Sequence, residues 1–221
     1  MLTELYLEPS MLELCSQASF SDAHETKSIP VIAANLHRVM KPCQEQIWAV
    51  LRKSDDEDRL NYTLASTFLG RMCLSGDIYD LSEKQWETVE NAVGFYKKAA
   101  EIIKNGHTVY IGNNVRTNTK PEGQQIVITE YDGRQLIVAH RFENSEDINT
   151  GFLNGVKIIE MFGRADKDFT AQAWITEQIR EGKKRGRRRR CIKPLRLKKR
   201  LYNGVLCREP CKNQSNSARA A

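Results

Sequence analysis

The sequence predicts a mixed α/β fold, and three observations point to it. Apolar strand-like runs alternate with helical patterns over the first 106 residues, which is typical of a parallel sheet flanked by helices. From His107 the apolar residues recur at every second position, which is typical of an antiparallel sheet. The last part of the chain is strongly basic. We therefore divide the chain into residues 1–106, 107–163 and 164–221.

The first strand–helix unit surrounds an acidic turn. The apolar residues from Leu12 to Cys15 predict a buried strand, and Pro30 to Met40 predict a helix with proline at its start. Asp22, His24 and Glu25 lie between them. In α/β enzymes the catalytic residues lie on the turns that lead from a strand to the following helix. Spacing alone nevertheless favours helix capping or turn roles for all three residues.

A second strand–helix unit follows. Ile47–Leu51 is a short continuous apolar run, as parallel strands buried on both faces require. The acidic cluster Asp55–Asp58 puts negative charge at a helix N-terminus, and Gly76-Asp77 marks a turn after that helix. The buried stripe of the helix is predicted to comprise Leu60, Leu64, Thr67, Phe68 and Met72.

The residues from Ser82 to Gln85 have the pattern of a capping box, which predicts the start of a third helix. Lys104 and Gly106 end this helix in the expected order. We expect its aromatic residues to pack in the core. The apolar and aromatic residues that recur at helical spacing are Trp86, Val89, Val93, Tyr96, Ala100 and Ile103.

Beyond this helix the pattern predicts an antiparallel sheet. Asp132-Gly133 separates two β-rich runs and is a strong hairpin signal. The four predicted strands are Thr108–Ile111, Gln125–Tyr131, Gln135–Phe142 and Val156–Phe162.

The basic character of the chain belongs to its last part. Residues 164–221 carry 18 Lys or Arg and 5 Asp or Glu. Residues 1–163 carry the other 16 Lys or Arg and 23 Asp or Glu, so this part of the chain is acidic. Residues 165–181 could form one helix. Residues 183–200 contain 12 basic residues and no acid, and such a run repels itself and stays unfolded alone. We expect 164–221 to be a disordered tail.

The composition indicates a reduced, cytoplasmic protein without metal or cofactor. Six cysteines lack a scaffold spacing, and Cys191, Cys207 and Cys211 lack the paired spacing and the histidine that a zinc site would need. No secretory signal is evident, and no apolar run is long enough to span a membrane.

Three stretches carry a resemblance to a known family: MLELCSQASFSDAHE, QIWAVLRK and LGRMCLSGDIYDLSEKQW. They resemble the C-terminal part of glycoside hydrolase family 36, which contains bacterial α-galactosidases. The similarity covers Leu7 to Phe162 and is strong over Met11 to Gly106. It implies a partial (β/α)8 barrel, consisting of its last βα units, followed by an antiparallel β-sandwich-like segment.

The resemblance also implies roles for individual residues. Asp22 matches the general acid/base of the family, and Glu25 and Trp48 are candidate substrate-binding residues. For Glu25 helix capping is the favoured alternative, and Trp48 could be barrel core. The family nucleophile lies on an earlier strand that this chain lacks. The family's glycine-rich sugar motif is replaced by Thr3 to Leu7.

The sequence thus predicts a truncated α-galactosidase-like retaining glycosidase, inactive alone, whose substrate is an α-galactoside oligosaccharide. An α-N-acetylgalactosaminide substrate stays open, and the intact parent could form a homo-oligomer. The alternative function is binding of nucleic acid or an acidic surface through residues 183–200, because basic runs neutralise phosphates. That tail could also be a non-native extension.

Overall fold

The computed structural model describes residues 9–19, 26–111, 120–164 and 170–179, which lie in one compact unit, Met1–Arg180. Its helices are α1 (Pro9–Leu14), α2 (Ile29–Leu36), α3 (Glu57–Ser66) and α4 (Glu83–Asn105). Its strands are β1 (Ala18–Ser19), β2 (Glu45–Leu51), β3 (Arg71–Gly76), β4 (His107–Ile111), β5 (Gln124–Tyr131), β6 (Arg134–Arg141), β7 (Val156–Arg164) and β8 (Ala171–Gln178). The 3-10 helices are η2 (Pro42–Gln44), η3 (Thr67–Leu69), η4 (Ile78–Asp80) and η5 (Thr150–Leu153).

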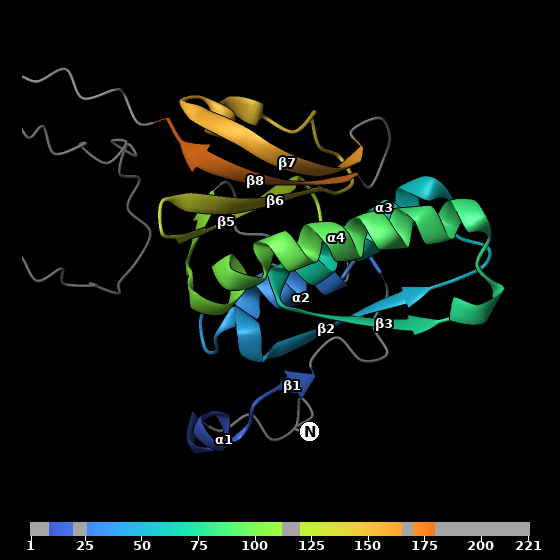
Figure 1. Ribbon diagram of the computed structural model, residues 1–221, viewed down its shortest axis with the longest axis horizontal. Helices are drawn as coiled ribbons and strands as arrows, with labels where there is room; N and C mark the ends of the chain where they lie inside the picture. The colour runs from blue at the N-terminus through green and yellow to red at the C-terminus, as the bar shows by residue number, and fades with distance from the viewer. Residues whose placement is uncertain (1–8, 20–25, 112–119, 165–169, 180–221) are drawn as a thin grey trace, which may run out of the picture. The chain divides into compact units, whose positions relative to one another are not determined.

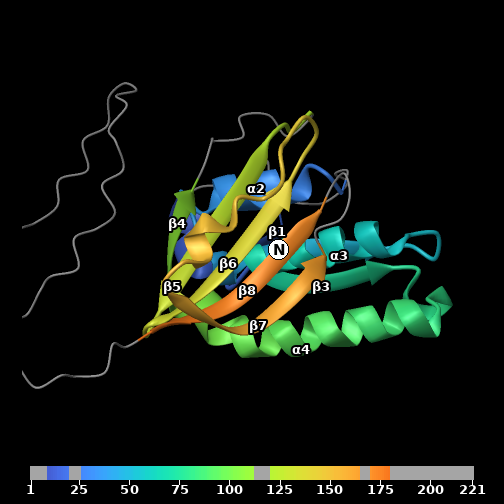
Figure 2. The same ribbon diagram turned by 90° about the horizontal axis from the view of Figure 1, so that it is seen from above.

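Helices α2, α3 and α4 form a layer between two sheets (Figure 1). One sheet is parallel, in the order β1-β2-β3, and strands that are consecutive in the chain are neighbours. The other is antiparallel, in the order β4-β5-β6-β8-β7, and Figure 2 shows its strands side by side. One hydrophobic core contains residues from both sheets and the helices. The predicted mixed α/β class and antiparallel sheet are therefore confirmed.

The first strand is not where the sequence placed it. The prediction assigned Leu12 to Cys15 to a strand, but Leu12 lies in α1 and the strand is the two-residue β1. The side chain of Gln44 donates hydrogen bonds to the carbonyls of Leu12 and Cys15 at 2.8 and 3.2 Å. This distant side chain satisfies carbonyls at the end of α1, a contact that local sequence does not reveal.

Strand β3 was missed because the predicted helical stripe ran on to Met72. Helix α3 ends at Ser66, and the chain turns through η3 and Gly70 before β3 begins. A side chain at Gly70 would place its Cβ 2.6 Å from the carbonyl oxygen of Glu45. Glycine therefore permits the close approach to β2 that lets β3 pair with it.

The second sheet gains a strand from the predicted tail. Residues 171–178 were assigned to a helix or a disordered tail, but they form β8, which pairs with β6 on one side and β7 on the other. Ladder hydrogen bonds on both edges outweigh the helix propensity of Ala and Gln. The four other predicted strands are confirmed as β4 to β7, and Asp132 and Gly133 form their hairpin turn with φ of 49° and 73°.

The antiparallel sheet packs its inner face on the helices. Phe162 of β7 lies in an aromatic cluster with Phe68 and Phe95, at ring distances of 5.1 and 6.1 Å. In the described part of the chain this face meets a helix layer, and the opposite face carries a smaller cluster around Trp174 and Phe152. Trp86, predicted to be core, is 37% exposed because it lies in the first turn of α4, before the first buried residue, Val89.

The capping box that begins α4 also fixes the helix to the parallel sheet. Oε1 of Gln85 accepts a hydrogen bond from the backbone N–H of Ser82 at 2.9 Å. Nε2 of Gln85 reaches the carbonyls of Arg52, Lys53 and Asp55 in the loop after β2, at 3.3, 3.3 and 3.0 Å. One side chain thus joins two strand–helix connections.

We predict that Gln85→Ala destabilises the fold by about 1–3 kcal/mol, because it removes half of the capping box and leaves loop carbonyls unpaired. Urea denaturation followed by circular dichroism measures this change. Glu90→Ala at an exposed position of α4 is the control and should change stability little. Equal stabilities of the two variants would contradict the role of Gln85.

A buried polar cluster joins α3 to the antiparallel sheet. His140 of β6 is fully buried, its Nε2 lies 3.2 Å from Oγ of Ser66, and its ring packs edge-on against Tyr62 at 5.0 Å. Burial lowers the pKa of His140 to about 3, against an opposing contribution from a hydrogen bond with the Tyr62 backbone. The imidazole is therefore neutral in the folded protein at neutral pH.

We predict that His140 makes folding stability fall with acidification. Between its unfolded pKa of 6.5 and its folded pKa of about 3, the unfolded chain binds a proton that the folded chain does not. The stability contribution is therefore complete above pH 6.5 and is lost as pH falls, by about 2 kcal/mol between pH 7 and 5. His140→Gln retains a hydrogen-bonding group but does not titrate.

Urea denaturation at several pH values tests this difference. The parent should lose about 2 kcal/mol more than His140→Gln over that range, whereas His107→Gln at an exposed position of β4 should follow the parent. Parallel pH profiles for the parent and His140→Gln would refute the assignment.

Candidate functional site

The residues predicted to carry the chemistry lie partly outside the described structure. Asp22, His24 and Glu25 fall in residues 20–25, which directly follow the last residue of β1 in sequence. The basic run 183–200 also falls outside it. Trp48 is the predicted site residue whose surroundings are described.

Trp48 lies on β2 with its indole directed to the end of β1. Its Nε1 donates a hydrogen bond to Oγ of Ser19 at 2.6 Å, and the side chain is half-buried. Ser19 is the last residue of β1 and is three residues before Asp22. The structure therefore brings Trp48 to the point where the chain leaves β1 for the acidic turn.

The face of the parallel sheet that carries Trp48 is mixed in character. Ile47, Ala49 and Leu51 alternate with it and are buried in the helix-facing core. On the face that carries Trp48, Gln46 of β2 pairs with Arg71 of β3, Trp48 with Cys73 and Val50 with Ser75.

Polar atoms line part of this face. Oε1 of Gln46 is buried and has no hydrogen-bond partner among the described residues. The guanidinium of Arg71 donates to the carbonyl of Ser16 at 3.1 Å. The face thus combines one aromatic ring with amide, guanidinium, thiol and hydroxyl groups, and sequence reasoning found only Trp48 because register sets the others.

The acids at the carboxyl ends of β2 and β3 bind neighbouring groups. Oδ1 of Asp77 lies 3.3 Å from a guanidinium nitrogen of Arg52, and its Oδ2 accepts from the backbone N–H of Lys53 at 3.3 Å. The buried Asp55 carboxylate accepts from the backbone N–H of Arg52 at 2.8 Å and pairs with Arg59 at 2.9 Å. These contacts assign structural roles to both acids.

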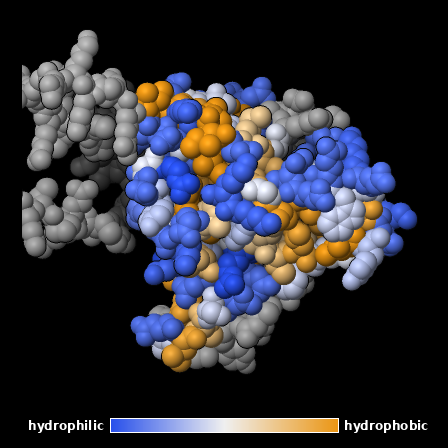
Figure 3. Space-filling model, viewed as in Figure 1, coloured by the Kyte–Doolittle hydropathy of each residue, from blue (hydrophilic) through white to orange (hydrophobic). Residues whose placement is uncertain are grey.

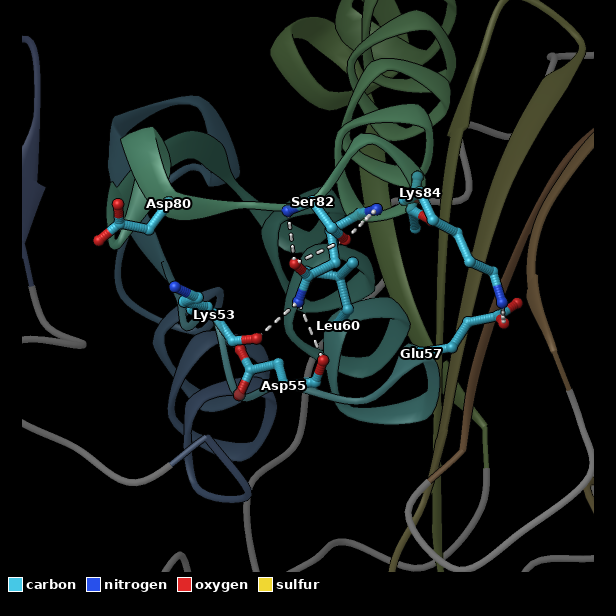
Figure 4. Close-up of a pocket in the computed structure, with 9 residues that line it drawn as sticks. Lys53, Asp55, Glu57, Leu60, Asp80, Ser82 and Lys84 are labelled. Carbon is cyan, nitrogen blue, oxygen red and sulfur yellow. Dashed lines mark hydrogen bonds and ion pairs between the residues drawn. The ribbon is translucent and has the colours of Figure 1, made fainter.

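A cavity of about 550 Å³ opens beyond these strand ends (Figure 4). Figure 4 shows Lys84 reaching Glu57, with which it forms an ion pair of 3.0 Å. The charged groups are mixed in sign, so the cavity does not favour an ion of either charge. Its lining comprises Lys53, Asp55, Glu57, Leu60, Asp80, Ser82, Lys84, Gln85 and Thr88.

A second polar pair is buried at the opposite end of β2. Oε2 of Glu45 lies 3.5 Å from Nε2 of His37, and both side chains are almost completely inaccessible. Burial raises the pKa of Glu45 well above its ordinary value and lowers that of His37 to about 4, although its hydrogen bond to the Leu69 carbonyl opposes the latter shift. His37 is therefore neutral near pH 7, and the raised pKa of Glu45 favours the protonated form of its carboxyl group.

This pair is not a catalytic candidate, because parallel-sheet enzymes place their chemistry at the carboxyl ends of strands and Glu45 begins β2. Burial also raises the pKa of the neighbouring Tyr110 to about 12, with a smaller contribution from Glu45. Among the described residues no group of three or more His, Cys, Asp and Glu side chains could hold a metal ion. None of the described helices has the length and apolar character needed to cross a membrane.

No family model matches this chain, and no curated protein sequence matches it. Solved structures of GH36 α-galactosidases do match in fold. For AgaA from Geobacillus stearothermophilus the TM-score is 0.58 at 15% identity, over 78% of this chain and 27% of that one. For the α-galactosidase from Lactobacillus brevis it is 0.56 at 14% identity, over 76% and 27%.

The chain thus spans about a quarter of the length of the α-galactosidases it matches. At this identity the comparison shows the fold. A structure of one AgaA variant contains 1-deoxygalactonojirimycin, and for it the TM-score is 0.59 at 15% identity, over 78% of this chain and 27% of that one. The resemblance to GH36 predicted from the sequence is confirmed as one of fold: the chain folds as a part of a GH36 α-galactosidase does.

Proposed function

We propose that this chain is the acid/base-bearing part of an α-galactosidase-like retaining glycosidase and is inactive by itself. The observation that carries the proposal is the position of Trp48, hydrogen-bonded to Ser19 at the carboxyl end of β1. In (β/α)8 barrels the substrate lies at the carboxyl ends of the strands. The acidic turn with Asp22 begins directly after that position in sequence.

The arrangement of the parallel sheet supports a partial barrel. Its three strands follow each other in chain order, and the connecting helices cover the same face (Figure 1). A doubly wound sheet reverses its strand order and places helices on both faces, whereas a barrel does neither. The face opposite the helices would then line the barrel interior, where Trp48 can stack on a sugar ring.

The chemistry requires a second carboxylate. A retaining glycosidase uses two carboxyl groups about 5–5.5 Å apart, of which one attacks the anomeric carbon. The other protonates the leaving oxygen and then activates water. Asp22 takes the second role in this proposal. Glu25 is proposed to bind substrate, since the N-cap residue of α2 is Ser28. No residue of this chain matches the family's nucleophile, so both steps need the remainder of the barrel.

The substrate proposed is a terminal α-galactoside of an oligosaccharide. AgaA variants have been solved with stachyose and with raffinose, and the two structures match this chain over a similar share of its length. The proposed organisation keeps a barrel part in residues 1–106 and a β-domain from residue 107. The basic residues after the sheet have no part in the proposed catalysis.

We predict that the isolated chain releases no nitrophenol from p-nitrophenyl α-galactoside above the buffer rate, because the nucleophile is missing. The release is followed by absorbance. A measurable rate that disappears in Asp22→Asn would contradict this prediction and would mean that the chain contains a complete site.

A chimaera tests the role of Asp22 directly. We predict that residues 7–179, which include β8, restore hydrolysis when joined to the remaining part of a GH36 α-galactosidase, and that Asp22→Asn then lowers kcat about 10²–10⁴-fold. Asp77→Asn is the matched control, because Asp77 already pairs with Arg52, and it should change kcat far less. Equal losses in the two variants would refute an acid/base role for Asp22.

A further inference from the structure

Strand β7 is an edge of the antiparallel sheet, and in the described part of the chain it pairs only with β8. It is nine residues long and contains no proline. Ile158, Ile159 and Met161 are 47%, 47% and 59% exposed. Figure 3 shows an apolar patch in the upper part of the view, over β7. A long apolar edge of this kind is a template for pairing with another strand.

The register of β7 sorts its side chains between the two faces of the sheet. Lys157 pairs with Glu177 and Glu160 pairs with Ile175. Since Glu177 and Ile175 are two residues apart on β8, Lys157 and Glu160 lie on the same face. This happens because the ladder shifts between Ile158 and Glu160, which leaves Ile159 as an extra residue.

The same shift aligns three apolar residues on the opposite face. Val156, Ile158 and Met161 pair with Gln178, Thr176 and Trp174, which alternate along β8. Without the bulge, Met161 would lie on the other face from Ile158. The edge therefore presents an apolar row on one face and a Lys157–Glu160 pair of opposite charge on the other.

We propose that β7 pairs antiparallel with β7 of a second copy of this chain. A two-fold axis between Ile158 and Ile159 places Lys157 opposite Glu160 of the second copy, and the symmetry repeats this ion pair. It also places Val156 opposite Met161 of the second copy twice. The order of charges along the strand is thus self-complementary, as a symmetric dimer requires. Opposite charges and apolar pairs at facing positions stabilise antiparallel strands.

Glu160 can accept the second lysine without losing its present partner. Nζ of Lys98 on α4 lies 2.6 Å from Oε2 of Glu160, and the Glu160 side chain stays 36% exposed. A carboxylate accepts several hydrogen bonds through its two oxygens. Lys98 therefore orients Glu160 at the edge, and joining two such edges would extend the sheet across the dimer.

Charge reversal gives a test that depends on this register. Sedimentation velocity of the full chain over a range of concentrations should show a monomer–dimer equilibrium. Lys157→Glu and Glu160→Lys each place like charges opposite one another twice, so each should raise the dissociation constant at least about tenfold. An equimolar mixture of the two variants restores both ion pairs and should form a heterodimer with parent-like affinity.

Glu130→Lys on β5 is the matched control and should dimerise like the parent, because it lies away from β7. Thermal melts identify any variant that fails to fold. If Glu160→Lys fails to fold because it loses its ion pair with Lys98, the variant Ile158→Lys is used in its place. Ile158 lies next to the two-fold axis, so this variant should also weaken the dimer. A monomeric parent, parent-like affinity of the single variants, or a mixture that stays monomeric would each overturn the proposal.

Discussion

From Leu60 to Ser66 helix α3 is buried on every side, and the rest of the fold depends on how it is covered. Seven consecutive residues, from Leu60 to Ser66, are buried. The parallel sheet covers one side of this helix, the antiparallel sheet covers another, and α4 packs beside it. A helix of this kind is stable only inside a layered protein, because no face of it can meet water.

Two buried polar side chains of α3, those of Tyr62 and Ser66, have partners in other elements. The hydroxyl of Tyr62 donates to the carbonyl of Lys27 at 3.1 Å, and Oγ of Ser66 donates to the Tyr62 carbonyl at 2.9 Å and contacts His140. These contacts join the loop before α2, the helix and strand β6. Burying these hydroxyl groups unpaired would cost more than the modest net gain from each bond, so this network fixes α3 against the loop before α2 and against β6.

The two sheets differ in what their free surfaces offer. The parallel sheet presents a mixed polar face, on which the indole of Trp48 donates a hydrogen bond to Ser19. The antiparallel sheet ends in the apolar edge of β7, whose bulge sets Lys157 and Glu160 on one face. Both surfaces depend on strand register, since a shift of one residue exchanges the faces of every side chain beyond it.

The sequence by itself determined the elements that short-range signals encode. These are helix α2 with Pro30 in its first turn, the Ser82–Gln85 capping box and the Asp132-Gly133 hairpin, and each depends on groups within four residues. It also pointed to Trp48 and Asp22, although only through a family resemblance. Tertiary structure alone decided β1, β3 and β8. It also determined the burial of Glu45 and the contact of Trp48 with Ser19, because each of these depends on hydrogen bonds or packing between segments distant in the chain.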